Sequence, residues 1–254
     1  MSANCQEVLK PRDEQWSPCL ACALRNDNIC GLLFGENEQC IAPNLQLGLA
    51  QVSQSHRTAL RRQTIYRGGQ PSKSIAVICA GWACTYIKLP DGDRQILSFL
   101  LPGDMTSATA VFQDSSPVSI EAVSDLRYCT IDKAELRAVL TSDRRVLDAF
   151  FEIWARKKDA VEQLASDLGH RTAEQRIARL LLDLTARLGA RGLVCDGRFA
   201  FPLRLQHIAD ATGLTIVHVS RVTGTMRKLS LIELDGRFLT ILNLGGLKNI
   251  SNAD

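Results

Sequence analysis

The spacing of apolar residues divides the chain into a strand-rich part and a helical part. Between about residues 63 and 133, short apolar segments alternate with turns such as Pro90–Asp93 and Pro102–Asp104, whose glycines tolerate a positive φ. Several short strands joined by such turns indicate a sandwich or barrel. The predicted strands cover residues 75–80, 82–89, 95–101, 118–123 and 126–131.

A long amphipathic helix is predicted over about residues 143–168. Its apolar residues recur at spacings of three, four or seven, namely Leu147, Phe150, Trp154, Val161, Leu164 and Leu168. Such a stripe fits a core helix or a helix that pairs with a second copy of the chain. The length and the near-heptad spacing favour the dimer helix, although Lys157 and Lys158 interrupt the stripe.

The C-terminal part has the pattern of a winged helix-turn-helix. An amphipathic helix over 173–188 precedes a short helix over 206–212, a tight turn over 213–215 and a second helix over 217–229. Two short strands around Asp235 and Gly236 then predict a hairpin, which would be the wing.

The second of the two short helices carries hydroxyl and basic side chains and no acidic residue, and Thr215 is a good N-cap for it. The early residues of a helix in the major groove face base edges, so Ser220 and Arg221 are candidates for reading sequence, with Arg221 suited to guanine. Arg227 and Lys228 lie later and suit phosphate. The alternative is a plain helical hairpin with a solvated basic face.

Charge and composition agree with a DNA-binding protein. Residues 170–254 hold 12 Lys and Arg against 7 Asp and Glu, a net +5, whereas the rest of the chain carries −2. No apolar run is long enough for a membrane span and no signal peptide is evident, so we expect a cytoplasmic protein without membrane contact. No nucleophile triad, phosphate-binding loop or paired carboxylates suggest an enzyme.

The nine cysteines include a cluster at Cys19, Cys22 and Cys30. In a reducing cytosol clustered cysteines more often bind metal or undergo redox chemistry than form disulfides. The residues alone leave open an iron–sulfur cluster, a zinc site with four thiolates, reactive thiols, and apolar packing.

Three runs of sequence resemble the CRP/FNR superfamily of transcription regulators. They are Gly81-Trp-Ala with the later Leu89-Pro-Asp-Gly-Asp-Arg-Gln-Ile-Leu-Ser-Phe-Leu-Leu-Pro-Gly-Asp104, then Arg171-Thr-Ala-Glu-Gln-Arg-Ile-Ala-Arg, and Gly213-Leu-Thr-Ile-Val-His-Val-Ser-Arg221. The resemblance implies an α+β protein: a cysteine-rich segment (1–45), a jelly-roll-like β-roll sensor domain (46–142), a dimerisation helix (143–169) and a winged helix-turn-helix (170–254). It also implies a homodimer on a near-palindromic double-stranded DNA site.

Within this superfamily the cysteines point to the FNR-like branch, which is controlled by oxygen through a 4Fe-4S cluster. The resemblance matches Cys19, Cys22 and Cys30 to three ligands and Cys129 to the fourth, with Cys5 and Cys40 as alternatives. Cyclic-nucleotide binding is not expected, because the stretch after Gly103-Asp104 has no arginine to meet a phosphate. The alternative function is a cluster-free regulator that is constitutive or controlled by thiol oxidation.

The resemblance also implies functional roles for three further positions of this chain. Val217 stands where the family has a glutamate that reads cytosine, so a different half-site is expected, with His218 as a candidate replacement. Val161 stands where the family has an inhibitory aspartate in the dimer helix, so the dimer is expected to persist without the cluster. The turn at Gly92 and Asp93 matches a loop that touches RNA polymerase, with a solvated hairpin as the alternative.

Overall fold

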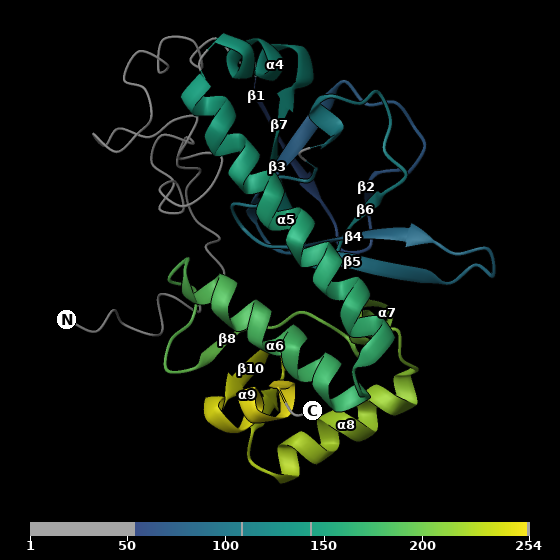
Figure 1. The fold of residues 1–254 in the computed structure, drawn as a ribbon, viewed down its shortest axis with the longest axis vertical. Coiled ribbons are helices and arrows are strands. Elements are labelled where there is room, and N and C mark those ends of the chain that lie inside the picture. The colour runs from purple at the N-terminus through teal and green to yellow at the C-terminus, as the bar shows by residue number, and fades with distance from the viewer. Residues whose placement is uncertain (1–53, 108, 143, 253–254) are drawn as a thin grey trace. The chain divides into compact units, whose positions relative to one another are not determined.

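The computed structural model describes residues 54–252 except 108 and 143 (Figure 1). The predicted cysteine-rich segment, including Cys5, Cys19, Cys22, Cys30 and Cys40, lies outside the described residues. The described chain forms two compact units. One comprises residues 54–88 and 97–161, and the other comprises residues 89–96 and 162–252.

Two sheets form the core of the first unit. The strands of these sheets are Gln54–Ala59 (β1), Thr64–Tyr66 (β2), Ser74–Ala80 (β3), Ala83–Lys88 (β4), Arg94–Leu100 (β5), Ser119–Ala122 (β6) and Leu126–Asp132 (β7). The strand orders are β1-β7-β3 and β2-β6-β4-β5. β7 pairs antiparallel with both of its neighbours, so that Cys129 lies between His56 and Val77.

In the β1-β7-β3 sheet, β3 is a nearly continuous apolar run, and most residues of β3 and β7 are buried, whereas the edge strand β1 is polar and largely exposed. Leu126 and Tyr128 of β7 join the apolar cluster that contains Ile120 of the second sheet. Cys129 and Ile131 alternate with them and point to the opposite face.

Two helices, α4 (Lys133–Ser142) and α5 (Arg144–His170), cover that opposite face (Figure 1). Leu136 and Leu140 of α4 and Val146 and Phe150 of α5 pack in one cluster with Cys129. The predicted long helix is therefore confirmed, although its first turns contribute to the core of the first unit. The short 3₁₀ helix η3 (Thr109–Val111) closes the same cluster through Val111.

The second unit contains α6 (Ala173–Gly189), β8 (Arg198–Ala200), α7 (Leu205–Thr212), α8 (Ile216–Lys228), β9 (Ile232–Asp235), β10 (Phe238–Ile241) and α9 (Leu244–Asn252). Its three-stranded sheet has the order β8-β10-β9. The β9–β10 turn uses Gly236 at a φ of 59°, as the predicted hairpin requires. This arrangement confirms the α+β class and the winged helix-turn-helix.

The sequence patterns did not predict β1, β2, α4 or α9. In α9, Gly245 and Gly246 lower the helix propensity of a nine-residue segment. The helix forms because Leu247 is fully buried and because Gly246 lies against Leu231, where a Cβ atom would approach Leu231 Cδ2 to 2.7 Å. Tertiary packing here outweighs local propensity.

The division into two compact units does not follow the four predicted domains. It places the boundary inside α5, between Val161 and Glu162, and it groups residues 89–96 with the C-terminal unit. The predicted limits at 142 and 169 stay a proposal. Within the described residues, no helix is both long and apolar enough to cross a membrane.

Candidate nucleic-acid interface and sensor region

The helix-turn-helix is built by one glycine and one cap. Gly213 ends α7 with φ 64° and ψ 36°, and a Cβ atom there would lie 2.9 Å from Leu168 Cδ2. Both the positive φ and the close approach therefore require glycine. Thr215 begins α8, and its hydroxyl oxygen accepts a hydrogen bond of 3.3 Å from the backbone N–H of His218.

One face of α8 is buried in the second unit, and the other is exposed. Val219, Val222, Thr223 and Met226 form the buried face. All six residues predicted to contact DNA lie on the exposed side, namely Val217, His218, Ser220, Arg221, Arg227 and Lys228. The described residues offer no ion-pair partner within 4.0 Å to the last three of these. Their contact with DNA stays a prediction, but the required exposure is present.

A buried carboxylate joins the end of α5 to the helix-turn-helix domain. Asp167 is 9% exposed and accepts hydrogen bonds from Gln163 Nε2 at 2.9 Å, and from Arg171 Nε and Arg179 Nε, both at 2.8 Å. Arg171 also donates from Nη1 to the carbonyl oxygen of Ser251 in α9. We call Asp167, Arg171 and Arg179 the hinge cluster. Charge-assisted hydrogen bonds of this kind hold α5, α6 and α9 in one arrangement.

A second arginine reinforces this joint. Arg176 of α6 donates to the carbonyl oxygens of Leu168 at 2.8 Å, Arg171 at 3.0 Å and Thr212 at 3.1 Å. Leu168 and Thr212 lie in the last turns of α5 and α7, where carbonyl groups lack helical partners, and Arg171 directly follows α5. Sequence analysis missed the joint, although the i,i+4 spacing of Asp167 and Arg171 was a signal for part of it.

The predicted dimer residues on α5 differ in their surroundings. Phe150 is only 4% exposed and packs in the core of the first unit, so in this conformation its side chain is not available to a second chain. Its neighbour Phe151 is 59% exposed, and its ring contacts that of Trp154, with the centroids 4.9 Å apart and the planes tilted by 45°. We define the α5 stripe as the exposed or half-exposed apolar residues Leu147, Phe151, Trp154, Val161 and Leu164.

One residue of the predicted seam, and one residue that interrupts it, make contacts within their own chain. Leu168 is half-buried and packs toward Gly213 of the helix-turn-helix, which gives it a role within its own chain. Lys157, which interrupts the apolar pattern, donates from Nζ to the carbonyl oxygen of Met105. Its ammonium group therefore makes a hydrogen bond within the first unit and does not point along the stripe.

Cys129 is the one predicted metal ligand among the described residues. Its side chain is fully buried in β7, on the face of the sheet that α4 and α5 cover. Its surroundings are apolar, with Ile75, Val77 and Leu136 in the same cluster. The described residues contain no group of three or more His, Cys, Asp or Glu side chains that could hold a metal ion.

The hairpin that was expected to meet RNA polymerase is well ordered by its own hydrogen bonds. Gly92 has a φ of 91°, and the backbone N–H of Asp93 donates to Asp91 Oδ1 at 3.0 Å. Gly92 and Asp93 are both exposed. The next residue, Arg94, forms an ion pair of 2.7 Å with Asp210 of α7. The base of this turn therefore has a structural role, while its tip is free to contact other molecules.

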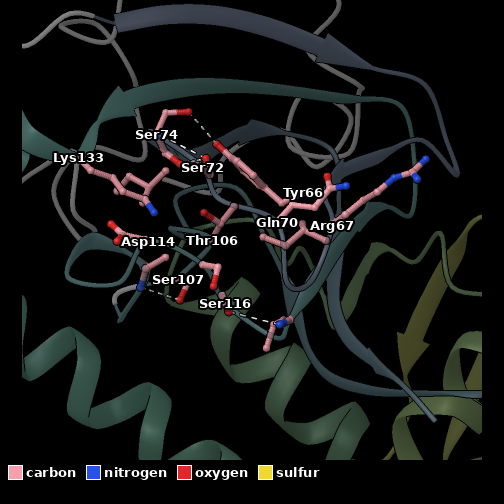
Figure 2. A pocket seen from close by; sticks show the side chains of 15 residues that line it. Tyr66, Arg67, Gln70, Ser72, Ser74, Thr106, Ser107, Asp114, Ser116 and Lys133 are labelled. Atoms are coloured by element: carbon pink, nitrogen blue, oxygen red, sulfur yellow. Dashed lines mark hydrogen bonds between the residues drawn. The ribbon is translucent and has the colours of Figure 1, made fainter. Parts of the chain in front are cut away.

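A shallow hollow opens in the first unit at the stretch that precedes β6 (Figure 2). Hydroxyl groups from Tyr66, Ser72, Ser74, Thr106, Ser107, Ser115 and Ser116 line much of it. Lys133 is buried there, and its Nζ donates to the carbonyl oxygen of Gln113 at 2.9 Å. Burial lowers the pKa of Lys133 and raises the pKa of Tyr66.

The cations of this hollow do not form a phosphate site. Figure 2 shows Lys133 and Arg67 at opposite ends, with the Arg67 guanidinium directed away from the other labelled side chains. Among the described residues between Met105 and Pro117, none is an arginine or lysine. The polar lining includes a carboxylate, that of Asp114, which would repel an anion.

Two family models match the chain. The model for a cyclic nucleotide-binding domain matches residues 56–143, and the model for a Crp-like helix-turn-helix domain matches residues 175–250. The first match describes the fold of the β-rich unit. It does not alter the chemistry of the hollow described above.

Curated relatives and a solved structure agree with both matches. The chain is 28% identical to the transcriptional activator protein FnrA of Stutzerimonas stutzeri, over 95% of each chain. It is 24% identical to the fumarate and nitrate reduction regulatory protein of Vibrio cholerae, over 80% of this chain and 81% of that protein. The structure of FixK2 from Bradyrhizobium japonicum is similar with a TM-score of 0.72 and 25% identity, over 80% of this chain and 99% of that one.

Proposed function

Because this chain belongs to the CRP/FNR family of transcription regulators, we propose that it is a DNA-binding homodimer whose activity responds to oxygen through a 4Fe-4S cluster. The family consists of transcription regulators and not of enzymes. The observation that carries DNA binding is the exposed face of α8, which presents hydroxyl and basic side chains from Ser220 and Arg221 to Arg227 and Lys228 in the last turn. A regulator of DNA acts where the chromosome lies, so we propose a cytoplasmic location.

The proposed ligands of the cluster are Cys19, Cys22, Cys30 and Cys129. Four thiolates are the usual ligand set of such a cluster, and the names of the two relatives above connect them with activation and with fumarate and nitrate reduction. The cluster would supply a centre that oxygen destroys. Cys129 contributes a fully buried thiol in apolar surroundings, and α4 and α5 pack against its strand.

The full burial of Cys129 also favours a second candidate, a regulator without a cluster. A thiol beneath the side chains of α4 and α5 can reach iron only if this packing opens. In the second candidate, Cys129 is simply a small apolar residue of the core. The two candidates differ in whether removal of its sulfur affects bound iron.

The decisive experiment compares two buried cysteines. We expect protein purified without oxygen to contain iron and acid-labile sulfide, and we expect Cys129→Ala to lose both. Cys84→Ala is the matched control, because Cys84 is equally buried but is not a proposed ligand. Equal iron in all three proteins would exclude Cys129 as a ligand, and absence of iron from the wild-type protein would favour the cluster-free candidate.

The proposed dimer uses the α5 stripe. Leu147, Phe151 and Val161 leave large apolar side chains exposed at spacings of four and ten along one helix, with Trp154 between them. An apolar stripe of this kind along a long helix is suited to a second helix with the same stripe. Dimerisation would place two copies of α8 on a DNA site with two-fold symmetry. The tip at Gly92 and Asp93 stays the proposed contact for RNA polymerase.

A further inference from the structure

The most exposed of the large apolar side chains in the described structure is at the start of the recognition helix. Val217 is 79% exposed and occupies the first turn of α8. Isolated apolar residues on a surface need no explanation by themselves. Here, however, Val217 and the half-exposed Ile216 begin the helix that is proposed to enter the groove, and Val217 shares its face of that helix with hydroxyl and basic side chains.

The position of Val217 on the helix is that of a residue that faces base edges. Ser220 and Arg221 follow it by three and four residues, so all three share one face of α8. The buried residues Val219 and Val222 lie on the opposite side. The Thr215 cap fixes the direction of the first turn. In a helix the β-branched valine has one strongly preferred rotamer, so its two methyl groups occupy fixed positions.

We propose that Val217 reads the C5-methyl group of a thymine in the major groove. Thymine is the one base that presents a methyl group there, and an apolar side chain is its natural partner. Valine has no acceptor for the exocyclic amine of cytosine. Cytosine at this position would leave an unpaired donor facing two methyl groups, which is unfavourable. Val217 therefore selects thymine over cytosine, next to the guanine that Arg221 is proposed to bind.

This inference rests on the proposed DNA-binding function, and its test begins without an assumed target. Full-length protein, purified and kept without oxygen, is used to select duplexes from a random library. Each thymine of the selected half-site is then replaced, one at a time, by deoxyuridine, which lacks only the methyl group. We expect one replacement to weaken binding by the wild-type protein about fourfold, the equivalent of one buried methylene-sized group.

The variant Val217→Ala completes the cycle. We expect it to bind the thymine site about as weakly as the wild type binds the deoxyuridine site, with little further loss when deoxyuridine is introduced. Leu229→Ala is the matched control, because Leu229 is also exposed and apolar but caps the far end of α8. It should keep the full penalty for deoxyuridine. The melting temperature of both variants should stay close to that of the wild type, because neither side chain is buried.

The possible outcomes distinguish a failure of the proposed DNA-binding function from a failure of the proposed role of Val217. If no sequence is enriched, the proposed function fails and this inference fails with it. If a sequence is enriched but no thymine is sensitive to loss of its methyl group, or if Val217→Ala keeps the full deoxyuridine penalty, sequence-specific binding stands and the role of Val217 is wrong. Placing 5-methylcytosine in the position of the sensitive thymine, paired with guanine, should weaken binding less than cytosine does.

Discussion

The outward faces of α5 and α8 are both exposed, yet they have opposite chemistry. The α5 stripe presents Phe151 and Val161, with Trp154 between them, whereas α8 presents mainly hydroxyl and basic groups, with Ile216 and Val217 exposed in its first turn. Exposure alone therefore does not say what a surface binds. An apolar stripe gains free energy when water is excluded from it, and a basic face gains when it meets a polyanion. The comparison predicts that α5 pairs with a second copy of the chain and that α8 binds DNA.

The largest expected effect comes from placing a charge in the α5 stripe. Val161→Asp would bring two carboxylates together in the dimer seam, where burying an unpaired charge costs several kcal/mol. We expect sedimentation velocity in air to show a shift from dimer to monomer. Ala160→Asp adds the same charge beside the stripe and should leave the dimer intact. A dimer that persists in Val161→Asp would remove Val161 from the seam.

The second effect divides the α8 face into base reading and phosphate binding. Arg221→Ala should cost about 1–3 kcal/mol on the selected DNA and little on scrambled DNA. Arg227→Ala should weaken both and reduce the salt dependence by about one unit, because one phosphate contact is lost. Binding titrations at several salt concentrations measure both quantities. Equal losses on the two DNAs for Arg221→Ala would show that Arg221 binds phosphate.

The third effect concerns the hinge cluster, which lies within the C-terminal unit. Asp167→Asn removes the charge that Arg171 and Arg179 share, and we expect a loss of about 1–2 kcal/mol of unfolding free energy because both arginines are partly exposed. Asp183→Asn, in the more exposed pair with Arg187, should cost no more than about 0.5 kcal/mol. Denaturant unfolding of both variants decides whether the hinge cluster stabilises the C-terminal unit.

The smallest effect is expected at the hairpin tip. Asp93→Ala removes an exposed carboxylate and should lower transcription activation without changing DNA affinity or thermal stability. Gly92→Ala must be tested separately, because a φ of 91° strains any side chain and would cost about 1 kcal/mol by itself. A parallel fall of DNA affinity in Asp93→Ala would show that the tip serves the structure instead of a partner.

The α8 surface could be predicted almost completely from the sequence. The signals are local: Gly213 and Thr215 mark the turn and the start of the helix, and the apolar period of the helix shows which face is buried and which is exposed. The strands from β3 to β7 were found for the same reason, since their apolar segments are bounded by turns. The missed elements α4 and α9 depend on contacts with distant residues, which local propensity does not contain.

The choice between Phe150 and Phe151 shows where sequence reasoning stops. Both are aromatic neighbours on one helix, and either fits a spacing of three or four, so the pattern alone selected Phe150. Only the packing of α5 on the β1-β7-β3 sheet decides that Phe150 is buried and Phe151 is exposed. Likewise, the sequence resemblance singled out Cys129 as a candidate ligand, but it gave no sign that this side chain is completely buried.

The sequence by itself determined the class of the protein, the helix-turn-helix and the order of its elements, because these follow from periodicity, caps and turns within a few residues. Tertiary structure alone decided which side of α5 is exposed, how Asp167 gathers Gln163, Arg171 and Arg179, and how deeply Cys129 lies. The physical reason is that burial and charge pairing depend on groups that meet in space from distant parts of the chain.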